Sequence, residues 1–242
     1  LAAEITQGRF IDPILTFDIA SRVLTNNAPK NIKKITVINI DHGIENIRAS
    51  IDRKELIRAV RDGTPLDKLF TFDKISDLDD KVIIKQNNRI YPHLYWELKP
   101  HMRGTLQHQI KFYFYQLEAL LHTEYSFSKN LHLTADYGID IFNNFDEYTY
   151  HVPDGELHHV RQDRRLYLTE AESGLRRMAL DYTFDFHKNV KAKLSAGYIE
   201  WMYGGIGGEI LYMPDSRNWA LGFDLAWVKQ RDFDGKFGFQ DF

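Results

Sequence analysis

The stretch "NWALGFDLAWVKQ", residues 218–230, alternates between two kinds of side chain. Every second residue from Trp219 to Trp227 is large and apolar, whereas the positions between them are mostly small, with Asp224 among them. Successive side chains of a β-strand point to opposite faces, so the stretch predicts a strand with one apolar face. A protein core and a lipid bilayer would each accept that face, and the two imply different functions.

The same two-residue period recurs after about residue 90. Further alternating segments lie at 94–102, 111–125, 131–141, 177–186 and 190–198. Most have the length of about nine to eleven residues that crosses an outer membrane, whereas ordinary sheet strands have about five or six. The pattern therefore favours a mainly β fold, an antiparallel transmembrane β-barrel or part of one. A soluble antiparallel sandwich or jelly roll fits the same alternation and stays open.

Aromatic residues stand near the ends of several apolar faces. Such rings favour the membrane interface, because the ring is apolar while its N–H or O–H reaches water or headgroups. We therefore expect the following side chains at the interfaces: Tyr113, Tyr125, Tyr182, Trp219 and Trp227. The opposite face carries charges that would line an aqueous lumen and offer hydrogen bonds to a sugar. The candidates are Glu118, Asp136, Asp140, Lys191, Lys193 and Asp224.

In residues 1–88 the apolar residues are spaced differently. They predict a small α/β domain ahead of the strands of residues 89–242. Asp12 and Pro13 are a typical N-cap and first helical residue, and Asp52 stands in a D-x-x-E pattern that resembles a capping box. Between the two predicted helices, alternating apolar residues around a short turn predict a β-hairpin. The expected elements are a helix over 12–28, strands over 33–40 and 44–51, and a helix from residue 53.

Composition excludes few classes of protein. The 242 residues carry a net charge of -3, which offers no basic face to nucleic acid. No apolar run reaches the length of about 18 residues that predicts a transmembrane helix. The absence of cysteine removes disulfide and thiolate chemistry, and fits an envelope protein as well as a cytosolic one. The chain begins at Leu1 without an initiator Met, so we expect a mature chain or a piece of a longer one.

Two glutamates, Glu200 and Glu209, flank the stretch "WMYGGIGG". Two carboxylates about 5–10 Å apart across a hairpin can hydrolyse a glycosidic bond, which leaves an envelope glycosidase open. Gly204, Gly205 and Gly207 are better explained by a turn or by a close approach of two backbones. No nucleophile motif or phosphate-binding loop accompanies them, so we expect a protein without enzymatic activity.

Three histidines, His151, His158 and His159, share a polar loop with two acidic residues. Their spacing matches no known zinc or calcium motif, and a solvated loop explains them better. The sequence therefore predicts neither a metal nor a cofactor.

The C-terminal segment 198–242 combines three patterns. They are the E-x-M-Y-G-G-x-G-x-E core from Glu200 to Glu209, a Trp-Ala-Leu-Gly strand, and a W-V-K-Q-R-D-F-D…F-G-F-x-D-F ending. With the alternating segments from about residue 94, this combination resembles the YjbH-like family of Gram-negative outer-membrane proteins, which is associated with exopolysaccharide and group 4 capsule secretion.

The resemblance implies an outer-membrane β-barrel with small periplasmic domains, acting in the export or surface assembly of polysaccharide. The implied partners are outer-membrane lipid, a polysaccharide and, through residues 1–88 in the periplasm, other proteins of the secretion system. Two alternatives stay open. The alternation of the strands also fits a soluble β-sandwich that binds carbohydrate, and the two glutamates also fit an envelope glycosidase.

Overall fold

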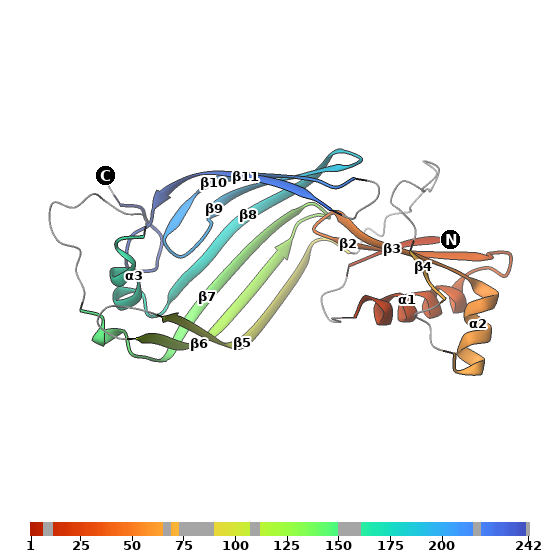
Figure 1. Ribbon diagram of the computed structural model, residues 1–242, viewed down its shortest axis with the longest axis horizontal. Helices are drawn as coiled ribbons and strands as arrows, with labels where there is room; N and C mark the ends of the chain where they lie inside the picture. Colours follow the sequence, from red (N-terminus) through yellow and green to blue (C-terminus); the bar gives the residue numbers. More distant parts are fainter. Residues whose placement is uncertain are drawn as a thin grey trace. The chain divides into compact units, whose positions relative to one another are not determined.

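The computed structural model describes residues 1–6, 12–64, 69–72, 90–106, 112–149, 161–214 and 219–240. The N-terminal part contains a four-stranded sheet in the order β1-β2-β3-β4 and two helices (Figure 1). Its elements are β1 (Ala2–Ile5), α1 (Pro13–Asn27), β2 (Lys34–Asp41), β3 (Ile44–Asp52), α2 (Arg53–Asp62) and β4 (Thr71–Phe72). The predicted helices and hairpin are all present. The parallel pairing of β1 with β2 and the short β4 were not predicted.

The helix ends of this part follow from their capping residues. The Asp12 carboxylate accepts the amide of Ile14 at the start of α1, and Asp52 accepts the amides of Lys54 and Glu55 at the start of α2. These bonds satisfy amides that have no partner within a helix. Gly63 ends α2 in the left-handed conformation, with φ of 67°.

The core of the N-terminal part lies between α1, α2 and the sheet. Apolar side chains of β2 and β3 alternate toward the helices, so each strand contributes one face to the core. The buried cluster consists of Phe17, Ile35, Val37, Ala49, Ile51, Leu56 and Phe70.

A single seven-stranded antiparallel sheet dominates the rest of the chain (Figure 1). Its strands are β5 (His93–Leu106), β6 (Tyr113–Ser126), β7 (Leu131–Asn143), β8 (Gly174–His187), β9 (Val190–Tyr198), β10 (Tyr203–Tyr212) and β11 (Leu221–Gln230). Neighbours in sequence are neighbours in the sheet, and the longest connection, between β7 and β8, contains two short helices. The mainly β fold and the long antiparallel strands are thus confirmed. Within the described ranges the sheet is open, with β5 and β11 as its edges, and the barrel itself stays a prediction.

In this sheet the apolar face is exposed and polar residues of the other face are buried, which is the reverse of the usual arrangement in a soluble protein. The apolar face is exposed along the strands, as at Trp96, Leu98 and Trp227, the last of which is 81% exposed. On the polar face, Glu118 is fully buried, and Gln116 beside it is fully buried too. A soluble sandwich would pair two apolar faces in its core. Among the described residues, no second apolar layer covers this face.

Two short helices cover one end of the polar face. They are the 3-10 helix η3 (Phe145–Glu147) and α3 (Arg164–Glu170), neither of which was predicted. Phe145 of η3 and Leu168 of α3 pack with Phe114 of β6 and Tyr148 in a buried cluster. None of the described helices combines the length and the apolar stretch needed to cross a membrane.

Candidate functional site

The polar face of the sheet is organised around the carboxylate of Glu118 on β6. Arg176 of β8 donates to Glu118 Oε2 through Nη2 at 2.7 Å and through Nε at 3.1 Å. The opposite oxygen, Oε1, contacts His101 Nδ1 at 2.9 Å and lies 3.7 Å from Arg103 Nε, both on β5. Two strands, β5 and β8, therefore place guanidinium groups around one buried anion on β6. Such an arrangement is stable only because the charges are paired.

A β-bulge brings Arg176 to Glu118. In the pairing of β7 with β8, Asp136 lies opposite Arg177 and Tyr137 lies opposite Leu175, so Arg176 is the extra residue. A bulge redirects a side chain that strict alternation would place on the other face. Arg176 and Arg177 consequently both form ion pairs with polar-face carboxylates, Arg177 with Asp181 at 2.7 Å. Sequence reasoning missed Arg176, because the alternation around it placed it on the apolar side.

Gln116 extends the network toward β7. Its side-chain oxygen accepts from Arg103, and its amide nitrogen donates to Asp140 at 2.6 Å and to the Glu172 carbonyl at 2.7 Å. The predicted sugar-path residues Glu118 and Asp140 are thus joined through Arg103 and the buried amide of Gln116.

Trp201, between β9 and β10, lies beside two further guanidinium groups. The guanidinium carbon of Arg103 is 5.5 Å from the ring centroid, and that of Arg164 on α3 is 6.0 Å away. Arg164 also donates to the hydroxyl of Thr105 on β5. Favourable cation–π contacts hold both cations at this end of the sheet.

The other predicted sugar-path residues form ion pairs of their own or are exposed. Asp136 pairs with His122 at 2.6 Å, Lys191 pairs with Asp185, and Lys193 pairs with Glu209 at 2.6 Å. Asp224 lies exposed on β11. The structure therefore brings Glu118 together with Asp140 and Asp136, and distributes the other three candidates along the strands.

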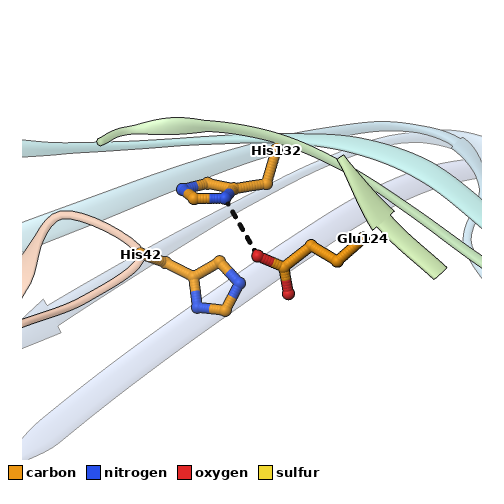
Figure 2. Close-up of side chains that lie close together, drawn as sticks. All are labelled: His42, Glu124 and His132. Carbon is orange, nitrogen blue, oxygen red and sulfur yellow. Dashed lines mark ion pairs between the residues drawn. The ribbon is translucent and has the colours of Figure 1, made fainter. Parts of the chain in front are cut away.

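Another polar-face pair joins β6 to β7. Figure 2 shows Glu124 and His132, whose Oε1 and Nδ1 atoms lie 3.2 Å apart. The second ring nitrogen of His132 contacts the Lys129 carbonyl at 3.0 Å, which fixes the orientation of the buried ring. His151, His158 and His159 lie outside the described residues.

The predicted interface aromatics are all on the apolar side or at strand ends. Tyr182, Trp219 and Trp227 are exposed. Tyr113 stacks on Tyr115 with ring centroids 5.6 Å apart, and Tyr125 meets Phe127 edge-on at 4.7 Å. Their assignment to a membrane interface stays a prediction.

The glycine-rich stretch is part of a strand, which corrects its interpretation as a turn. Gly204, Gly205 and Gly207 all lie within β10. A Cβ on Gly205 would overlap the Trp227 carbonyl of β11, and one on Gly204 would lie 3.0 Å from the Gly197 carbonyl oxygen. The predicted close approach of backbones is therefore present at two positions.

The two glutamates of this motif do not face each other across a hairpin. The Glu200 amide donates to the Tyr203 carbonyl at the start of β10, and its carboxylate accepts from Arg161 at 2.7 Å. Glu209 lies six residues further along the strand, about 20 Å from Tyr203 at roughly 3.3 Å per residue. This separation exceeds the spacing of about 5–10 Å expected for a glycosidase pair.

Gly205→Ala is expected to weaken the pairing of β10 with β11, lowering the free energy of unfolding by about 1–3 kcal/mol, because its methyl group has no space. Gly207→Ala is the matched control, since a Cβ there lies 3.6 Å from the Leu225 carbonyl in ordinary contact. The urea midpoint of the full-length protein in detergent measures both. Equal midpoints for the two variants would contradict the close approach at Gly205.

Arg231, just after β11, connects the C-terminal segment to β8 and to the turn between β9 and β10. This fully buried side chain donates to the carbonyls of Leu175, Glu200 and Lys236 at 3.0 Å each and lies 4.4 Å from the Tyr198 ring centroid. Burial lowers the pKa of Arg231. Burial also raises the pKa of Tyr167 on α3 to about 12, so its hydroxyl stays protonated and donates to the Arg231 carbonyl. These contacts join α3 to the end of the sheet beside Arg103 and Trp201.

Comparison with known proteins gives two matches. A curated relative, "Uncharacterized lipoprotein YjbH" of Escherichia coli (strain K12), is 32% identical over 124 residues. These residues make up 50% of this chain and 18% of the relative, so the match spans a small part of that protein. No solved structure matches the chain. The model of the YjbH family, described as "Exopolysaccharide biosynthesis protein YbjH", matches residues 1–242, and the chain therefore belongs to this family.

Proposed function

We propose that this chain forms part of the wall of an outer-membrane β-barrel in a Gram-negative bacterium. In this proposal the protein takes part in export or surface assembly of an exopolysaccharide or capsule and catalyses no reaction. The apolar face of the seven-stranded sheet contacts lipid, and the polar face lines the path of the polysaccharide. Residues 1–88 lie in the periplasm and contact other proteins of the secretion system.

The observation that carries the proposal is the inverted burial of the sheet. Apolar side chains of all seven strands remain exposed, and the set includes Leu98 of β5, Leu117 of β6, Ile139 of β7, Leu180 of β8, Leu194 of β9, Ile210 of β10 and Phe223 of β11. Soluble monomers rarely expose a continuous apolar surface of this extent. A strand of 9–14 residues with apolar side chains outward and charges inward is what a membrane-spanning barrel requires.

The polar face supports a sugar path. Its charged side chains are held by ion pairs between strands. Glu118 of β6 pairs with Arg176 of β8 across β7, and Lys193 of β9 pairs with Glu209 of the adjacent β10. Rigid polar groups with aromatic neighbours bind sugars by hydrogen bonds and ring contact. The description of the family as exopolysaccharide biosynthesis proteins supports an exopolysaccharide as the exported molecule. The E. coli relative is named a lipoprotein, which supports a location in the cell envelope.

Fractionation of cells that produce the full-length protein tests the proposal. We expect the protein in the outer-membrane fraction, extracted only by detergent, with faster gel migration before boiling than after. Compact migration before boiling is typical of a closed barrel, because its hydrogen-bonded strands have no free edge. Recovery in the soluble fraction, without a heat-dependent shift, would contradict the proposal.

A further inference from the structure

A pocket of about 490 Å³ opens on the polar face, at the end covered by α3 and η3. Its volume lies within the range of about 300–1,000 Å³ that is typical of small-ligand pockets. The residues that determine its charge are His101, Arg103, Glu118, Asp136, Arg164 and Arg176, and Trp201 forms part of its wall.

The cations of the pocket outnumber its carboxylates. Three guanidinium groups face Glu118 and Asp136, and Asp136 is already paired with His122. The Glu118 carboxylate is then left to balance the charge of the arginines. Its oxygens lie 2.7 Å from a nitrogen of Arg176 and 3.7 Å from a nitrogen of Arg103. The closest acceptors of Arg103 and Arg164 are the neutral oxygens of Gln116 and Thr105. Among its lining residues the pocket thus keeps an excess of positive charge, whereas Asp140 lies outside the lining and accepts from the Gln116 amide.

After the excess of positive charge, the Arg164 side chain is the second feature that indicates a ligand-binding pocket. Within the described residues, its buried Nε has no hydrogen-bond partner. A buried donor without a partner is costly, and a ligand acceptor would remove that cost. Arg103 and Arg164 both line the pocket, and both lie beside the Trp201 ring, at 5.5 and 6.0 Å from its centroid.

We propose that this pocket binds the carboxylate of an acidic sugar within the exported polysaccharide. Planar guanidinium groups recognise carboxylates through paired hydrogen bonds, and in a half-buried site these bonds are stronger than in water. The rings of Trp201, Phe114 and Phe145 supply an apolar wall for the body of the sugar. This inference rests on the proposed function, because it assigns the polar face to the polysaccharide.

Binding of a defined probe to the full-length protein in detergent tests the inference. The probe is trigalacturonate, and its methyl ester is the neutral control. We expect the ester to bind at least about tenfold more weakly, because it cannot form charge-assisted hydrogen bonds. Raising the salt concentration should weaken the trigalacturonate complex and leave the ester complex unchanged. Equal binding of acid and ester would overturn the inference.

Variants locate the site. Arg103→Gln and Arg164→Gln should each weaken trigalacturonate binding about tenfold. Arg61→Gln, which removes an exposed cation of α2, is the matched control and should bind as the parent does. Asp136→Asn should tighten binding, because it removes a negative charge from the pocket, and damage to the fold cannot produce a gain. Unchanged binding in all three pocket variants would overturn the inference.

Two further measurements distinguish an acidic-sugar site from a phosphate site, and a failure of this inference from a failure of the proposed function. Inorganic phosphate that competes at the same concentration as trigalacturonate would identify a general phosphate site and overturn the assignment to an acidic sugar. Heat-dependent gel migration of the same preparations reports the barrel independently. A heat-modifiable protein that does not distinguish acid from ester contradicts only this inference, whereas a soluble protein without the heat-dependent shift contradicts the proposed function.

Discussion

Glu118→Gln is expected to lower the free energy of unfolding by about 3–5 kcal/mol, the cost of removing one partner from a buried ion pair. The Glu118 side chain is 0% exposed and that of Arg176 is 10% exposed, so water cannot replace the lost charge. The substitution keeps the size of the side chain but leaves Arg176, Arg103 and His101 around a neutral group. The urea midpoint of the full-length protein in detergent measures the loss.

Glu209→Gln provides the matched control for this prediction. Glu209 pairs with Lys193 at 2.6 Å, but their side chains are 54% and 31% exposed. Pairs that water reaches contribute about 0–1 kcal/mol, so the midpoint should hardly change. A similar small effect for Glu118→Gln would show that the buried network does not hold the strands together.

Leu225→Arg is expected to prevent or strongly reduce assembly into the outer membrane. Leu225 lies in the middle of the apolar face of β11 and is 70% exposed. An arginine that faces lipid near the bilayer midplane costs about 2–4 kcal/mol. The same substitution at a water-exposed surface position usually changes stability by less than about 0.5 kcal/mol. The heat-modifiable fraction of the protein in isolated outer membranes measures the effect.

Asp224→Arg is the control for the membrane prediction. It introduces the same side chain one residue earlier in β11, where alternation points it to the opposite face. We expect normal assembly, because an aqueous lumen accepts a charge of either sign. If Leu225→Arg assembles as well as Asp224→Arg, the apolar face of the sheet does not contact lipid.

Local sequence patterns determined the strands, their faces and the helix ends. Alternation depends only on the two-residue period of an extended chain, so the segment 218–230 and its counterparts predicted long strands that the sheet confirms. Asp12 and Asp52 act on amides two or three residues away, so their capping roles were also readable. The placement of Glu118 and Asp140 on the charged face followed from the same period.

Only the tertiary structure decided which charges meet. Arg176 reaches Glu118 because the register between β7 and β8 shifts at Asp136, and no local pattern marks a bulge that depends on two strands. The stretch around Gly205 is a strand because β11 approaches it closely, although glycines favour turns in isolation. Trp201 gains its two cations from β5 and α3, far away in sequence. The sequence by itself thus determined which face of the sheet is charged, and strand register determined where on that face a pocket with excess positive charge is formed.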